Sequence, residues 1–93
     1  MRKYDAVFIF QTGADKVTAA KEQVSGELTK ADIKVVEEQD LGEKDLAYDI
    51  KKANRGHYVR YEVEATPETI QPVQKALKLR SEILKFVFFR KEQ

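Results

Sequence analysis

The spacing of apolar residues changes along this chain from alternation to a helical repeat and back, which restricts the folds open to it. Residues 57–65 alternate strictly, as in a strand with one buried face. That face would consist of His57, Val59, Tyr61, Val63 and Ala65. After residue 15 the apolar spacing becomes three, four and four, which predicts one stripe on a helix. The stripe consists of Val17, Ala20, Val24 and Leu28.

Three further strands and a second helix follow from the same reasoning. Residues 4–10 and 83–90 are rich in aromatic and β-branched side chains, which favour strands. A longer extended segment, 33–50, is interrupted at Leu41-Gly42. The sequence Asn54-Arg55-Gly56 indicates the turn of a hairpin, because Asn and Gly tolerate positive φ.

Thr66-Pro67-Glu68 is typical of a helix start, with a hydroxyl cap and a proline in the first turn. Pro72 disturbs this helix, since an interior proline loses a hydrogen bond and clashes one turn back. We therefore expect the second helix either to begin a few residues after Thr66 or to bend at Pro72.

The predicted order is strand, helix, strand, strand, helix, strand. This order is typical of the split βαβ plan, an α+β, ferredoxin-like βαββαβ fold. The fold has one four-stranded antiparallel sheet with two helices on one face. Right-handed crossovers place the first and third strands in its centre. We expect one domain over residues 1–93.

Composition excludes several classes of protein. Lys and Arg number 17 against 16 Asp and Glu, so the formal net charge of +1 rules out nucleic-acid binding through overall charge alone. With no Cys there is no disulfide framework, thiolate metal site or Cys nucleophile. No apolar run approaches the ~20 residues of a membrane span. We expect a cytoplasmic protein that does not contact a membrane.

The charges are nevertheless segregated along the chain. Residues 37–49 hold six acidic side chains and one basic, whereas residues 75–91 hold six basic and one acidic. In the expected sheet order the ends of the first and fourth strands approach each other. A phosphate-facing patch is therefore predicted from Arg2, Lys3, Arg80, Lys85 and Arg90. The alternative is an ordinary solvated face.

The first and fourth strands carry more apolar residues than one buried face requires. Val7 and Ile9 oppose Phe8 and Phe10, and the fourth strand repeats this pattern. Some of these side chains are expected to face a protein partner. Alternatively, long charged side chains shade them.

The sequence gives little support for a catalytic site. His57 is the only imidazole and has neither a nucleophile motif nor a second His for a metal. Glu37-Glu38 with Asp40 is more typical of a solvated edge than of an acid/base pair, and the Thr12–Asp15 loop lacks the Lys-Ser/Thr of a P-loop. We expect no enzyme activity, no metal, no cofactor and no small-molecule substrate.

The third strand partly matches the RNA-recognition motif, which shares this topology. Arg55-Gly56-His57-Tyr58-Val59-Arg60-Tyr61 lacks the small residue of that pattern, and one missing position reverses the face of later side chains. The alternative function is therefore an RNA-recognition-motif-like module that stacks bases on sheet aromatics. Replacing Tyr58 and Tyr61 by Ala would test it.

Three segments resemble the bacterial small-subunit ribosomal protein S6 family. They are Met1-Arg2-Lys3-Tyr4-Asp5, Leu41 to Ile50 (Leu-Gly-Glu-Lys-Asp-Leu-Ala-Tyr-Asp-Ile) and Gly56-His57-Tyr58. The resemblance covers the whole chain, and its most specific part is Leu-Ala-Tyr-x-Ile with the preceding Gly. Asp45 and Asp49 depart from the family, which has a second basic residue and a proline there, and the acidic tail of some relatives is missing.

The resemblance implies a non-enzymatic constituent of the small ribosomal subunit that binds small-subunit (16S) rRNA together with ribosomal protein S18, as a heterodimer. Arg2, Tyr4, Lys44, Tyr48 and Arg80 match family positions. The candidate RNA-binding residues are Arg2, Lys3, Tyr4, Lys44, Tyr48, Lys52, Arg80, Lys85 and Arg90.

Overall fold

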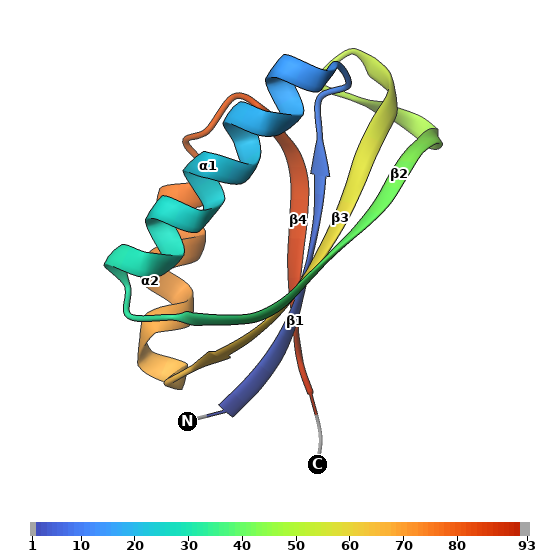
Figure 1. Ribbon diagram of the computed structural model, residues 1–93. Helices are drawn as coiled ribbons and strands as arrows, with labels where there is room; N and C mark the ends of the chain where they lie inside the picture. The colour runs from blue at the N-terminus through green and yellow to red at the C-terminus, as the bar shows by residue number, and fades with distance from the viewer. Residues whose placement is uncertain (1, 92–93) are drawn as a thin grey trace.

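The computed structural model describes residues 2–91 and contains the six expected elements. They are β1 (Arg2–Phe10), α1 (Ala14–Lys30), β2 (Lys34–Ile50), β3 (Ala53–Ala65), α2 (Pro67–Leu77) and β4 (Ile83–Arg90). The strands form one antiparallel sheet in the order β2-β3-β1-β4, and both helices cover the same face of it (Figure 1). The prediction of a ferredoxin-like α+β fold with β1 and β3 in the centre is confirmed.

The core lies between the sheet and the two helices. Alternate residues of β1 point into it: Tyr4, Ala6, Phe8 and Phe10 are all buried. Phe8 is opposite Val59 on β3 and Phe86 on β4. Four aromatic rings surround it with centroid distances of 5.5–6.1 Å. The alternation that predicted the strands therefore also predicts which side chains face the helices.

The turn of the β2–β3 hairpin is not where we predicted it. Asn54 to Gly56 lie within β3, and the turn consists of Lys51 and Lys52, with φ of 49° and 68°. Ile50 pairs with Ala53, so this is a two-residue loop with positive φ at both positions, as a type I′ turn requires. Lys is an uncommon residue at such φ values, so the residue types at positions 51 and 52 did not predict a turn there.

Gly56 has a packing role instead of a turn role. A Cβ at this position would overlap the Cγ2 methyl of Ile9 and lie 3.4 Å from Cδ2 of Leu46. Glycine thus lets the side chain of Ile9 lie across β3.

Two other residue patterns that were expected to interrupt a strand or helix do not end it. β2 continues through Leu41-Gly42 with a register shift between Asp40 and Gly42, where Gly42 has φ of 84°. Helix α2 begins at Pro67 and runs through Pro72, so the later start is wrong, and the alternative of a bend at Pro72 stays a prediction.

Candidate functional site

The sheet face that the helices leave open carries an apolar patch across β1, β3 and β4. We call the following residues the open-face patch: Val7, Ile9, Tyr58, Val87 and Phe89. Together with Lys85 and Phe86 they line a shallow depression of about 250 Å³. Val87 and Phe89 are 41% and 54% exposed. The apolar residues in excess of one buried face are therefore gathered in one place, as an interaction surface requires.

The other half of the open face carries a group of ion pairs. Arg60 lies at its centre, with Nη1 2.7 Å from Oδ1 of Asp5 and Nη2 3.0 Å from Oε1 of Glu37. Lys91 pairs with Glu62 at 2.8 Å, which lowers the pKa of the Glu62 carboxyl. Part of the acidic stretch of β2 is thus neutralised within the protein.

On the helix side, Asp40 connects β2 to β3 and α1. Its Oδ1 lies 2.7 Å from Nε2 of His57 and accepts the backbone N–H of Gly42 at 2.9 Å, while its Oδ2 lies 3.0 Å from Nζ of Lys21. These contacts, that with His57 foremost, lower the pKa of Asp40 to about 2. The single His is therefore held in a structural contact.

The lowered pKa of Asp40 predicts a contribution to acid stability. Because the folded pKa lies below the ordinary value of 3.8, the contribution is present above that value and is lost as pH falls toward 2. Asp40→Asn should remove this contribution, so the variant should lose less stability than the parent chain between pH 4 and pH 2. Urea denaturation at several pH values measures this, and parallel curves for the two proteins would contradict it.

Four predicted site residues lie toward the β2–β3 turn. We call Lys44, Tyr48, Lys52 and Lys85 the hairpin group. The ring of Tyr48 is 65% exposed, and its hydroxyl lies 3.5 Å from Nζ of Lys85. Nζ of Lys44 lies 5.4 Å from the ring centroid of Tyr58, a cation–π distance. Among residues 2–91, the lysines of this group form no ion pair.

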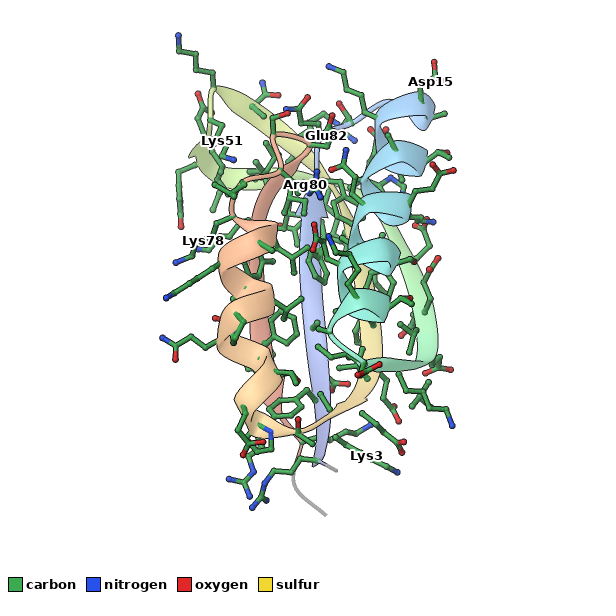
Figure 2. All side chains as sticks on the ribbon, turned by 90° about the vertical axis from the view of Figure 1, so that its left-hand side faces the viewer. Lys3, Asp15, Lys51, Lys78, Arg80 and Glu82 are labelled. Atoms are coloured by element: carbon green, nitrogen blue, oxygen red, sulfur yellow. The ribbon has the colours of Figure 1, made fainter. Side chains whose placement is uncertain are left out.

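Three other predicted residues lie at the opposite end of the sheet. Arg90 is close to the start of β1, because it pairs with Tyr4, and it joins Arg2 and Lys3 there. Figure 2 shows Lys3 at one end of the molecule and Arg80 near the other. The predicted single patch of Arg2, Lys3, Arg80, Lys85 and Arg90 is therefore wrong; Arg2, Lys3 and Arg90 are the terminal group, apart from the other two.

Tyr4 and Arg80 have internal roles. Tyr4 is 8% exposed and packs in the core, so its ring is not available to a base. Arg80 lies between the helices (Figure 2) and forms an ion pair with Glu27, whose side chain is 10% exposed. We therefore assign Tyr4 to the core, and we assign Arg80, whose side chain is 39% exposed, a structural role in the ion pair with Glu27. An rRNA contact by Arg80 stays a prediction.

Arg80→Ala tests this assignment. The substitution removes the only ion pair of Glu27 within residues 2–91 and leaves its largely buried carboxylate without that hydrogen bond, so the midpoint of thermal unfolding should fall. The RNA affinity of the folded variant should keep its salt dependence. A phosphate contact by Arg80 would instead reduce the salt slope by about one.

Tyr58 and Tyr61 do not form the pair of stacking rings that the alternative function requires. Tyr61 is fully buried on the helix side, where desolvation raises its pKa. Tyr58 is on the open face, beneath Lys44. Side chains on opposite faces cannot form one platform, which weakens the alternative of an RNA-recognition-motif-like module.

Two classes of feature are absent from the part of the chain that the structure describes. Residues 2–91 contain no group of three or more His, Asp or Glu placed to hold a metal ion. None of their helices is long and apolar enough to cross a membrane.

Comparison with known proteins decides the family. The family model for Ribosomal protein S6 matches residues 3–90. The chain belongs to the ribosomal protein S6 family. It is 30% identical over 92 residues to the small ribosomal subunit protein bS6 of Treponema denticola, covering 99% of each chain. The bS6 protein of Moorella thermoacetica is 28% identical, over 100% of this chain and 97% of its own.

The fold agrees with that of an S6 protein of known structure. The crystal structure of 30S ribosomal protein S6 from Thermotoga maritima matches with a TM-score of 0.87 at 22% identity, over 97% of this chain and 87% of that one. The C-terminal domain of MgtC from Mycobacterium tuberculosis also matches, with a TM-score of 0.65 at 13% identity, over 100% and 90% of the two chains. This S6 protein is thus a constituent of the small ribosomal subunit in the cytoplasm.

One departure from the S6 pattern has a structural partner. Oδ1 of Asp45 lies 2.6 Å from Nη1 of Arg55, directly across the hairpin, and Oε1 of Glu43 lies 3.5 Å from Nε of the same arginine. Asp45 therefore replaces a basic side chain and also neutralises another. Lys44, Lys51 and Lys52 are the cations of this hairpin arm that have no ion pair within residues 2–91.

Sequence reasoning missed two lysines next to the hairpin group. Lys51 donates from Nζ to the carbonyl oxygen of Ile83 at 3.0 Å, which joins the turn to the start of β4. Lys78 follows α2 on the same side of the molecule (Figure 2). Lys51 was missed because the turn was predicted at Asn54 to Gly56. Lys78 was missed because its segment contains many other basic residues.

Proposed function

We propose that this S6 protein binds small-subunit (16S) rRNA together with ribosomal protein S18, as a structural component without enzymatic activity. The observation that carries the proposal is the hairpin group, an exposed tyrosine among lysines that have no ion pair within residues 2–91, beside the open-face patch.

The hairpin group has the chemistry of an RNA contact. Lysines without an internal partner can bind RNA phosphates and displace the counterions condensed on the RNA. This displacement makes binding favourable and dependent on salt. An exposed aromatic ring such as that of Tyr48 adds stacking on an unpaired base, worth about 1–3 kcal/mol. The terminal group is a weaker candidate, because Glu62 lies near Lys3 and already pairs with Lys91.

The open-face patch has the chemistry of a protein contact. Val87 and Phe89 expose apolar surface that lacks the donors needed to read a base. Lys85 borders both the patch and the hairpin group. A partner on the patch would therefore lie next to the RNA, and the two proteins would present one continuous surface.

The test is a filter-binding titration of a 16S rRNA fragment with this chain, alone and with S18. A net charge of +1 gives the isolated chain little general attraction for RNA. Tight binding is therefore expected only when both proteins are present. Tight binding by the isolated chain, unchanged by S18, would contradict the proposal and favour the module that stacks bases on the sheet.

A further inference from the structure

Strand β4 forms one edge of the sheet, and a groove runs between this edge and helix α2. The groove has a volume of about 640 Å³. Its floor is apolar, with Leu77, Leu84 and Phe86 among the lining residues, and Lys51, Lys78 and Lys85 line it as well. Edge strands carry backbone N–H and C=O groups that no neighbouring strand satisfies, so they are templates for another strand.

The groove has a definite charge. Within residues 2–91, none of its three lysines forms an ion pair, although Lys21, Arg55, Arg60 and Arg80 all do. A hydrogen bond from Lys51 to the carbonyl of Ile83 partly closes the edge at the very start of β4. The three lysines lie toward the start of β4, and no Asp or Glu among residues 2–91 lines the groove.

This charge selects among possible strands. Symmetric pairing with β4 of a second copy would bring the same lysines together, and like charges across two paired strands are destabilising. A strand with Asp or Glu at alternate positions would instead place its carboxylates near the lysines and its apolar side chains toward the floor, since side chains alternate between the two faces.

We propose that the groove between α2 and β4 binds an extended acidic peptide segment, which joins the sheet as a fifth strand beside β4. The backbone hydrogen bonds supply affinity, and the lysines and the apolar floor supply selectivity, as in other cases of strand addition. The groove shares Lys85 with the hairpin group and Val87 with the open-face patch, so the charge test uses Lys51 and Lys78, which belong to neither.

The probe is an acetylated and amidated peptide of alternating Glu and Val, with eight residues to match the length of β4. Titration of the full chain labelled with nitrogen-15 should shift the amide signals of β4 and slow their hydrogen exchange. Methylating the backbone nitrogens of every second residue removes donors on one edge of the peptide. Two such peptides are compared, one methylated at the odd positions and one at the even positions. The peptide whose methylated edge faces β4 should bind about tenfold or more weakly, and the other should bind almost as the unmethylated peptide does.

Variants of the protein then test the charge. Lys51→Ala combined with Lys78→Ala should weaken peptide binding about tenfold, whereas Lys16→Ala with Lys30→Ala, two exposed lysines on α1, should not change it. Absence of binding, or equal effects of the two methylation patterns, would overturn the proposal. So would tighter binding of a single-stranded RNA of matched length through the same lysines, because the groove would then be an RNA surface.

Discussion

Phe8→Ala is expected to lower the free energy of unfolding by about 3–5 kcal/mol, a large share of the 5–15 kcal/mol typical of a domain. Phe8 is fully buried and lies on β1, in the middle of the sheet. Its ring contacts Tyr61 on one side and Phe86 and Phe88 of the edge strand β4 on the other. The truncation therefore loosens the strand that carries Lys85, Val87 and Phe89.

Urea denaturation of the parent and variant chains measures this loss. Phe8→Leu is the matched control, because it keeps most of the apolar volume and should cost clearly less. A loss below about 1 kcal/mol for the alanine variant would show that Phe8 is not the centre of the core.

Val87→Asp or Phe89→Asp is expected to weaken the association with S18, with an affinity loss of about 30-fold or more. A carboxylate in the centre of an apolar interface is buried without a partner, and central interface residues are worth about 2–4 kcal/mol. Both side chains are well exposed in the isolated chain, so the variants should stay folded. Calorimetric titration with S18 measures the affinity.

Leu79→Asp is the control for this experiment. Leu79 is 85% exposed, in the segment after α2 and outside the open-face patch, so the same chemical change should leave the affinity unaltered. Equal losses for Leu79→Asp and Phe89→Asp would mean that the effect arises from charge alone. Undiminished affinity of the Val87 and Phe89 variants would exclude the patch as the partner surface.

The fold could be predicted because each element has its own local pattern. The alternation from Val59 to Ala65 and the helical stripe ending at Leu28 both coincide with buried positions, although His57 at the start of the alternation is only partly buried. The hairpin turn could not be predicted, since Lys51 and Lys52 adopt positive φ that their residue type does not favour. Packing of Ile9 over Gly56 explains why the glycine lies in the strand instead.

The site could be predicted only in part, because charge along a sequence does not reveal ion pairs between distant segments. Arg80 is engaged by Glu27, 53 residues away, and Arg60 by Asp5, 55 residues away. The burial of Tyr4 was within reach, since it follows the alternation of Ala6, Phe8 and Phe10. Within residues 2–91 these ion pairs engage three of the arginines, Arg55, Arg60 and Arg80, and only two of the lysines, Lys21 and Lys91.

The salt dependence of rRNA binding in the presence of S18 tests the account most directly. It compares the triple variant Lys44→Ala, Lys52→Ala, Lys85→Ala with a control that loses three exposed helix lysines, Lys16, Lys30 and Lys75. The slope of log affinity against log salt should fall by about two to three in the hairpin variant and stay unchanged in the control. Equal slopes in the two variants would contradict the assignment of the hairpin group to rRNA.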